Sequence, residues 1–380
     1  MLDDAGGVRR VLHRSPSPAE RTPTVTVVIP CYNYARYVGS AIDSALTQAG
    51  VITDVIVVDD CSTDGSPEVV AAVAEQNPRV RLLRNDRNLG PVGTFNAGLE
   101  LATGEFLVRL DADDLLAPGA LQRATALADA FPSVGLVYGH PLHFSGTTLP
   151  SPRLRSTRWT VWPGTVWLEE RCRTALNVIT SPEVVMRRSV VDAVGGQREL
   201  AHTHDMEMWL RIAAVSDVGY LGGADQAWHR EHAASLSQSL DPRFGDIRDR
   251  RDAFETLFAW AQELDLDTAV LRRLARQALV DEAFRAIVHM YDRNKVDAAL
   301  LESYLAFLAE LGPRVSPHAA EAYRLIARGQ RRPTPWQHLR AIGRRSRSMA
   351  ERARWHRRGV YTRDRRVSLP PDTEHVGGPQ

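Results

Sequence analysis

The stretch VTVVIPCYNYARYVGSAIDSALTQAGVITDVIVVDD, residues 25–60, decides the fold of this chain. It starts with an apolar run at 25–30, continues with helical periodicity over 35–48, and returns to an apolar run at 54–60 that ends in two aspartates. Apolar strands that alternate with helical segments are typical of a parallel sheet covered by helices on both faces. The stretch therefore predicts an α/β fold with a mostly parallel sheet.

The same alternation continues as far as residue 110. Ser66 followed by Pro67 is the expected start of the next helix, since serine caps helices and proline fits the first turn. A strand at 79–85, a helix at 91–103 and a strand at 104–110 follow. Four strands and the helices between them are thus expected within the first 110 residues.

Polar residues follow three of these expected strands. They are PCYN at 30–33, Asp59-Asp60, and DADD at 111–114. The carboxyl ends of parallel strands meet at one edge of the sheet, where α/β proteins bind their ligands. Adjacent carboxylates resist ionising together, so the cluster at 111–114 fits either a solvated turn or a cation site.

Composition narrows the class of protein. The chain has 380 residues, of which 44% are hydrophobic and 24% charged, as in ordinary globular proteins of one large domain or two smaller ones. No apolar stretch approaches the length of about 20 residues that a membrane-spanning helix needs. Three widely spaced cysteines fit a reducing compartment, which predicts a cytoplasmic location.

The two ends of the chain differ from its centre. Residues 1–23 are rich in Pro, Arg and Ser and are expected to be disordered. Residues 241–330 show apolar periodicity of three and four, which predicts a helical extension. Residues 331–380 form a basic, partly disordered tail, with thirteen arginines between 331 and 366. This tail is either a solvated segment or a peripheral contact with the inner face of the cell membrane, and no recognised module predicts nucleic-acid binding.

Two phosphate-handling folds with acidic motifs fit poorly. A response-regulator receiver needs its acidic pair after the first strand and a lysine further on, and Lys295 is the only lysine in the chain. A haloacid-dehalogenase phosphatase places its Asp-x-Asp motif on the first strand, whereas the motif here follows the fourth expected strand. Both are discounted.

An ordered set of motifs resembles the family-two glycosyltransferases with the GT-A fold, a Rossmann-like, nucleotide-sugar-binding architecture. The matching segments are VTVVIPCYNYARYVGSAIDSAL, VIVVDDCSTDGS, NLGPVGTFNAGLELATGEFLVRLDADD, VVMRRSVVDAVGGQRE, HDMEMWLRI and WHREHAASLS. The resemblance covers residues 24–238 and implies a glycosyltransferase domain at 24–240. Each motif alone is weak, but their order and spacing are specific.

The resemblance implies a donor site at the predicted strand ends. Asp111 and Asp113 match the family's Asp-x-Asp, which holds Mn²⁺ or Mg²⁺ against the diphosphate of a UDP, dTDP or GDP sugar. Which of these two and Asp114 binds the metal directly stays open, as does the solvated-turn alternative. The residues implied to contact the nucleotide sugar are Pro30, Tyr32, Asn33, Asp60, Asn88, Gly90, Asp111, Ala112 and Arg230.

Two downstream motifs supply the remaining groups. Asp205 matches the base that takes the acceptor proton in an inverting transfer, and Glu207 is the alternative base. His204 stands where the family commonly has Glu, which is a departure from its pattern. His232 is expected to bind the metal. It faces the same way as Arg230 if the segment is extended.

The resemblance implies an inverting, metal-assisted glycosyltransferase of polysaccharide or cell-envelope glycan synthesis. Its acceptor would be a hydroxyl of a glycan or a lipid-linked sugar. The alternative is a non-catalytic scaffold subunit that binds sugar nucleotide. The departure at His204 is the only sequence feature that supports this alternative.

Overall fold

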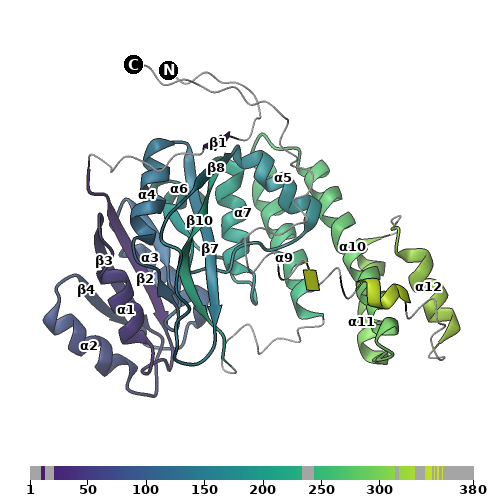
Figure 1. Ribbon diagram of the computed structural model, residues 1–380, viewed down its shortest axis with the longest axis horizontal. Helices are drawn as coiled ribbons and strands as arrows, with labels where there is room; N and C mark the ends of the chain where they lie inside the picture. Colours follow the sequence, from purple (N-terminus) through teal and green to yellow (C-terminus); the bar gives the residue numbers. More distant parts are fainter. Residues whose placement is uncertain are drawn as a thin grey trace.

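The computed structural model describes residues 10–12, 21–232, 244–312, 316–329, 339–344, 346, 349–350 and 353. The other residues, which include most of the predicted N-terminal and C-terminal tails, lie outside this description. Within the described part, a large twisted sheet with helices on both faces is followed by a group of helices at one side (Figure 1).

A single mixed sheet organises the described part of the chain. Its order is β1-β8-β10-β7-β9-β5-β2-β3-β4, and the short β6 pairs with β10. The strands are β1 (Arg10–Leu12), β2 (Thr24–Cys31), β3 (Ile52–Asp59), β4 (Val80–Arg84), β5 (Phe106–Arg109), β6 (Leu115–Leu116), β7 (Val134–Phe144), β8 (Arg158–Trp162), β9 (Val185–Arg187) and β10 (Asp217–Arg230). Strands β5, β2, β3 and β4 are parallel to one another, as are β7 and β10, while β9 joins the two groups in antiparallel pairing. The predicted mostly parallel sheet is confirmed.

Alternate residues of the central strand β2 face different layers. Val27 and Ile29 pack in the core formed with α1 (Val38–Leu46), α2 (Ser66–Gln76) and α4 (Ala120–Ala130). Val28 points the opposite way, into a second core on the other face of the sheet. This second core is formed with α3 (Gly90–Glu100), α5 (Gly164–Thr174), α6 (Arg188–Val194) and α7 (His204–Val215). The unbroken apolar sequence of β2 is therefore explained by burial on both faces.

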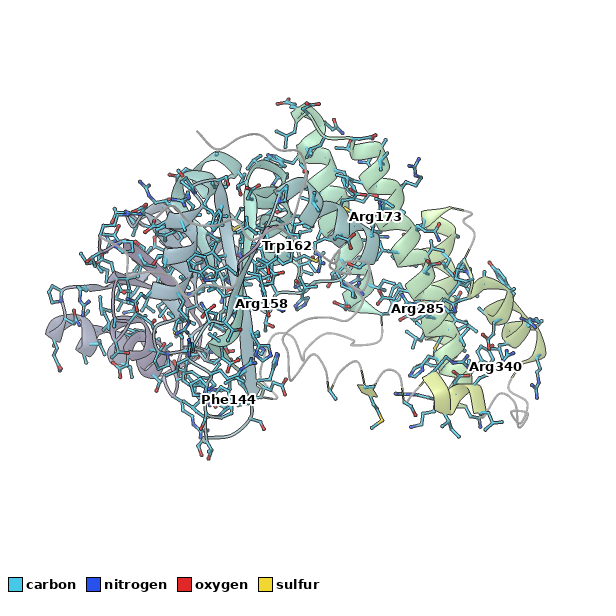
Figure 2. All side chains as sticks on the ribbon, turned by 45° about the horizontal axis from the view of Figure 1, so that its top comes forward. Phe144, Arg158, Trp162, Arg173, Arg285 and Arg340 are labelled. Atoms are coloured by element: carbon cyan, nitrogen blue, oxygen red, sulfur yellow. The ribbon has the colours of Figure 1, made fainter. Side chains whose placement is uncertain are left out.

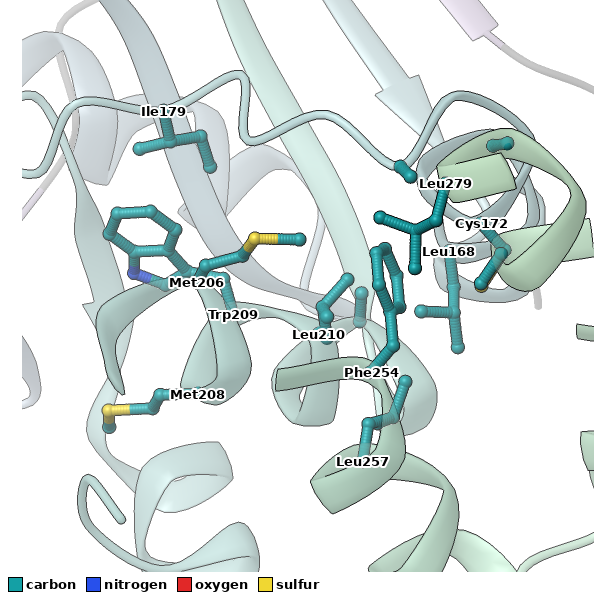
Figure 3. Packing of buried hydrophobic residues seen from close by; sticks show 14 of the residues in the cluster. Leu168, Cys172, Ile179, Met206, Met208, Trp209, Leu210, Phe254, Leu257 and Leu279 are labelled. Atoms are coloured by element: carbon teal, nitrogen blue, oxygen red, sulfur yellow. The ribbon is translucent and has the colours of Figure 1, made fainter. Parts of the chain in front are cut away.

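The predicted helical extension packs directly on the second of these layers. It consists of α9 (Gly245–Trp260), the short 3₁₀ helix η1 (Ala261–Glu263), α10 (Thr268–Asp292), α11 (Ala298–Leu311) and α12 (Ala319–Arg328). Figure 3 shows Phe254 of α9 and Leu279 of α10 beside Leu168 of α5 and Leu210 of α7. Helices on both sides of the predicted domain boundary after residue 240 thus share one hydrophobic core.

The structure differs from the sequence predictions in two places. Arg10–Leu12, inside the predicted disordered tail, form β1 and pair with β8, whose backbone groups would otherwise form an open sheet edge. Helix α2 begins at Ser66 itself, so Pro67 is its second residue. The carboxylate of Asp64 accepts hydrogen bonds from the Ser66 amide and from its hydroxyl, and so holds the turn before the helix.

No helix in the described part of the chain is both long and apolar enough to cross a membrane. The three cysteines are free thiols.

Candidate active site

The three polar clusters predicted from the sequence do lie along one edge of the sheet. Cys31 and Asp59 are register partners at the ends of β2 and β3, and the Asp60 amide donates to the Cys31 carbonyl at 2.8 Å. Strand β5 runs parallel to β2 on its other side, and the Leu110 amide bonds to the Val28 carbonyl. The chain therefore enters the 111–114 turn beside the other two clusters.

The aspartates of the 111–114 turn have different surroundings. The side chain of Asp111 is 34% exposed and pairs with Arg109 at 2.9 Å. Asp113 is more buried, and its Oδ2 lies 2.7 Å from Nε2 of His232. Burial, together with the charges of Asp114 and Asp111, raises the pKa of Asp113 to about 6. Like charges thus converge here, and a cation would relieve their repulsion.

Asp114 has a structural role. It is 1% exposed, and its two oxygens bind the Arg230 amide at 2.8 Å and Nδ1 of His229 at 3.0 Å. Burial lowers the pKa of His229, but the hydrogen bond and charge of Asp114 outweigh this and raise it to about 9. Asp114 therefore favours the protonated form of His229. Of the three carboxylates, this one anchors the end of β10.

Arg230 and His232 face the same way, as the extended segment predicts. The Arg230 guanidinium lies 4.6 Å from the Tyr37 ring centre and 4.4 Å from that of Phe144, the residue labelled at the lower end of the sheet in Figure 2. It also donates to the Asp113 carbonyl at 3.0 Å. The His232 ring stacks on Tyr37 with centres 5.7 Å apart. The segment after β10 therefore closes against the turn that carries Asp113.

Asp60, one of the residues implied to contact the nucleotide sugar, holds the loop before α3 through hydrogen bonds. Its buried carboxylate accepts from the amides of Leu89 at 2.7 Å and Gly90 at 2.9 Å, and from the side chain of Asn85. Asn88 donates to the Asp60 carbonyl at 3.2 Å. Asp60, Asn88 and Gly90 are thus brought together, and Asp60 has a structural task that the sequence did not reveal.

The loop after β2 carries the other expected nucleoside contacts. The Tyr32 ring is 47% exposed, which leaves it open for stacking. Asn33 adopts a positive φ of 61°, and its side chain accepts from the Thr63 amide at 2.8 Å. Pro30 lies within β2, and Ala112 is buried in the turn.

Asp205, the predicted base, is the second residue of α7. Its Oδ1 accepts from the Met206 amide at 2.5 Å. Burial raises the pKa of Asp205 to about 6, against the opposing charge of Arg109. A carboxylate with a pKa near neutral is suited to accept a proton. The neighbouring His204 is 6% exposed, and burial together with Arg109 lowers its pKa to about 3, so its imidazole is neutral.

The alternative prediction, that Glu207 is the base, is wrong. Its carboxylate is fully buried, and both oxygens bind the Arg211 guanidinium, at 2.8 Å from Nε to Oε1 and 2.9 Å from Nη2 to Oε2. A buried carboxylate held this way cannot meet an acceptor hydroxyl. The helical offset of two residues from Asp205 aims it into the core.

Sequence reasoning missed the residues that connect these groups. Arg109 is buried in β5, binds Asp111, and donates to the Ser181 hydroxyl at 3.3 Å. Ser181 has a positive φ of 130°, and Glu183 accepts from its amide at 3.1 Å. Burial raises the pKa of Glu183 to about 7. The available signal was the arginine itself, a charge inside the otherwise apolar run FLVRL at 106–110.

Comparison with known proteins identifies this architecture. A family model described as glycosyl transferase family 2 matches residues 26–195. These residues contain the strand ends and the 111–114 turn. Residues 26–195 of this chain therefore form a domain of glycosyl transferase family 2.

Curated relatives agree over shorter segments. The chain is 47% identical over 116 residues to the succinoglycan biosynthesis protein ExoO of Rhizobium meliloti, a match that covers 30% of this chain and 33% of ExoO. It is 31% identical over 218 residues to the uncharacterized protein MT1568 of Mycobacterium tuberculosis, covering 54% and 66% of the two chains. The chain thus spans about a third of the length of ExoO.

Solved structures share the fold. The chain resembles residues 1–349 of TarS from S. aureus, in complex with UDP-GlcNAc, with a TM-score of 0.56 at 18% identity over 76% of this chain and 82% of that one. It also resembles the mannosyltransferase PcManGT from Pyrobaculum calidifontis, in complex with GDP-Man and Mn²⁺. That match has a TM-score of 0.53 at 22% identity over 86% of each chain. The family-2 chain therefore has the GT-A fold with added C-terminal helices.

Proposed function

We propose that this family-2 chain is an inverting glycosyltransferase that moves a sugar from a nucleoside diphosphate donor to an acceptor hydroxyl. The observation that carries the proposal is the position of Arg109 between the carboxylates of the 111–114 turn and the carboxylate of Asp205. It binds Asp111 at 2.9 Å on one side, and on the other it lines a cavity with Asp205. The turn proposed to bind the donor and the proposed base are thus adjacent.

The residues of the turn fit a divalent cation. Asp111 and Asp113 offer oxygens, which Mg²⁺ and Mn²⁺ prefer, and His232 adds a nitrogen beside Asp113. No three His, Cys, Asp or Glu side chains converge as a closed metal site within the described ranges. We propose that Asp113, with Asp111 or His232, would hold the ion and that the donor diphosphate would complete its coordination. Once bound, the metal would neutralise charge that develops on the departing diphosphate.

The residues of this chain would perform the remaining steps. Asp205 accepts the proton of the acceptor hydroxyl as the hydroxyl oxygen bonds to the anomeric carbon. The bond from that carbon to the phosphate oxygen breaks, and the electron pair leaves with the diphosphate. Attack from the face opposite the leaving group inverts the anomeric centre. Tyr32 is the ring on which the nucleobase would stack.

We place the reaction in polysaccharide or cell-envelope glycan synthesis, with a glycan or lipid-linked acceptor. ExoO supports this setting through its description as a succinoglycan biosynthesis protein. The TarS and PcManGT complexes support a UDP or GDP sugar as donor, and dTDP stays a third candidate.

Thermal unfolding tests the donor site. UDP, GDP, dTDP and CDP are each added with and without Mn²⁺, to the wild type and to the Asp113→Ala variant. A ligand specific for the folded state stabilises it by about 2.7 kcal/mol at 100 times its dissociation constant. We expect a Mn²⁺-dependent rise in melting temperature with one diphosphate, absent in Asp113→Ala. No rise with any of the four would overturn the donor site.

We also propose a peripheral contact with the inner face of the membrane, at the C-terminal end of the described chain. Leu339, Ile342 and Met349 are 59–67% exposed and recur at helical spacing, and arginines lie between them. Residues 339–344 are helical, and Arg344 of this segment binds the Asp292 carboxylate. Figure 2 places Arg340 at the helical side of the molecule, away from the sheet. An apolar stripe flanked by cations suits an anionic bilayer surface.

Co-sedimentation with vesicles tests this contact. Vesicles of phosphatidylcholine with 30% phosphatidylglycerol, roughly the charge of an anionic leaflet, are expected to bind the wild type and not Leu339→Asp/Ile342→Asp. Vesicles of phosphatidylcholine alone are the control for charge. Equal binding by the wild type and the variant would overturn the contact.

A further inference from the structure

A small cavity adjoins Asp205 on the inner side of α7. Its polar lining comes from Arg109 of β5, Ser181 of the loop before β9, Gln197 of the loop after α6, and Asp205 itself. Its apolar wall includes Met208 and Trp209 of α7, both labelled in Figure 3. Side chains from four separate segments thus surround one space beside the proposed base.

Two polar atoms of the residues that line this cavity have no hydrogen-bond partner among the described residues. They are Nε of Arg109 and Oε1 of Gln197. The two residues are only 8% and 6% exposed. Buried polar groups are almost always satisfied, by protein or by internal water. One of these atoms is a donor and the other an acceptor, so a single molecule that both accepts and donates would satisfy both.

Gln197 is held firmly in place by its backbone. Its amide donates to the Asn96 side chain at 2.8 Å, and its carbonyl accepts from the same side chain at 2.8 Å. Arg211 of α7 donates to the carbonyls of Gly195 at 3.0 Å and Gly196 at 2.7 Å. The motif VGGQ is thus fixed between α3 and α7, the helix that carries Asp205. The proposed function assigns this motif no role.

We propose that the cavity binds one water molecule that accepts from Arg109 Nε–H and donates to Gln197 Oε1 and to the Asp205 carboxylate. The water fills the hydrogen-bonding capacity of both buried atoms. Gln197 and Arg109 are then positioning residues that fix the orientation of the Asp205 carboxylate. This last step rests on the proposed function, whereas the water site itself does not.

The surroundings of Asp205 explain why such a water would matter. From β5, the charge of Arg109 lowers the pKa of Asp205, and the charge of Asp111 beyond the strand raises it. On α7 itself, His204 is neutral. A hydrogen bond donated to the ionised carboxylate favours that form, so losing the water would raise the pKa of Asp205.

A crystal structure of the full chain tests the water site directly. We expect one ordered water within hydrogen-bond distance of Arg109 Nε, Gln197 Oε1 and an Asp205 oxygen. In Gln197→Met, which removes the acceptor at similar volume, we expect this water to be absent. An empty cavity in the wild type, or an unchanged water in Gln197→Met, would overturn the proposal. This result does not depend on whether the protein has transferase activity.

Kinetics test the positioning role. The assay follows release of nucleoside diphosphate from UDP-GlcNAc and from GDP-mannose with Mn²⁺. For Gln197→Met we expect kcat to fall roughly tenfold with an unchanged KM for the donor, because one hydrogen bond to the base is lost. Gln197→Glu keeps an acceptor oxygen for the water but adds a negative charge, which should raise the pKa of Asp205. In the pH profile of kcat for this variant, we therefore expect the fall at low pH to begin at a higher pH, while kcat at high pH recovers.

Gln226→Met is the matched control. Gln226 is equally buried, but its amide is bonded to the Ala120 carbonyl and to the Arg123 side chain. We expect this variant to lose stability and keep its kcat. If Gln197→Met behaves in the same way, with lower stability and normal kcat and pH profile, Gln197 is structural and the positioning role is refuted. If the wild type turns over neither of these donors nor a dTDP sugar while the water is present, the proposed function fails and the water site stands.

Discussion

Replacing Arg211 with methionine should destabilise the protein far more than its helical position suggests. Arg211 and Glu207 form a pair at i, i+4 on α7, and both side chains are 0% exposed. The same guanidinium donates to the carbonyls of Val194, Gly195 and Gly196. Arg211→Met therefore leaves a buried carboxylate without its partner and three carbonyls without a donor.

The magnitude follows from these contacts. Removing one partner of a buried ion pair costs about 3–5 kcal/mol, because the remaining charge is uncompensated. Arg198, 3.9 Å from Glu207, offsets part of that charge, while the lost carbonyl bonds add about 1 kcal/mol each where water cannot replace them. We expect a loss of about 4 kcal/mol in the free energy of unfolding.

Guanidinium chloride unfolding, followed by tryptophan fluorescence at pH 7.5, measures this loss. The double variant Glu207→Met/Arg211→Met removes the stranded charge, so it should be more stable than Arg211→Met by about 2 kcal/mol. Arg173→Met is the matched control, because Arg173 pairs with Glu169 at the same spacing on an exposed helix face. It should cost about 0.5 kcal/mol or less. A loss under about 1 kcal/mol in Arg211→Met, or a double variant no more stable than the single one, would refute the reasoning.

Three further predictions follow from the site and the fold. Asp205→Asn should lower turnover by about 10²–10⁴-fold while the thermal shift with nucleotide and Mn²⁺ stays, and loss of that shift would mean that Asp205 serves binding or folding instead. Because the base must be ionised and its pKa is raised to about 6, turnover should fall as pH drops below about 6, and a pH profile flat down to pH 4.5 would contradict this. Gly164→Ala should lower the melting temperature strongly, since its Cβ would lie 1.9 Å from the Ser216 carbonyl oxygen, whereas the Cβ of Gly39→Ala on α1 would meet nothing closer than 3.7 Å and should leave the melting temperature unchanged or higher.

The order of strands and helices up to residue 110 was predictable because the periodicity of the apolar residues matches the pattern of burial there. Strands that are apolar at every position have one stable solution, a sheet covered on both faces, and β2 shows it through the opposite packing of Val27 and Val28. The strand ends were informative for the same reason. Parallel strands bring their carboxyl ends to one edge, so Asp60 and Asp113 could be placed near each other without coordinates.

The different roles of the neighbouring aspartates in the 111–114 turn were not predictable. Asp111, Asp113 and Asp114 are chemically identical and adjacent, yet one pairs with Arg109, one meets His232, and one anchors the end of β10. These differences come from long-range partners, more than 100 residues away in the case of β10. A sequence pattern records the carboxylates but does not record which of them the rest of the fold uses.

The partner of a charged residue in a strand is a long-range property too, and Arg109 shows why it matters. A guanidinium inside a sheet needs a compensating charge or hydrogen bonds. Here Asp111 supplies the charge and Ser181 supplies an acceptor, while the Nε–H has no partner among the described residues and Arg109 lines the cavity beside Asp205. Under the proposed function, the short strand β5 thus connects the proposed donor carboxylates to the proposed base through the side chain of Arg109.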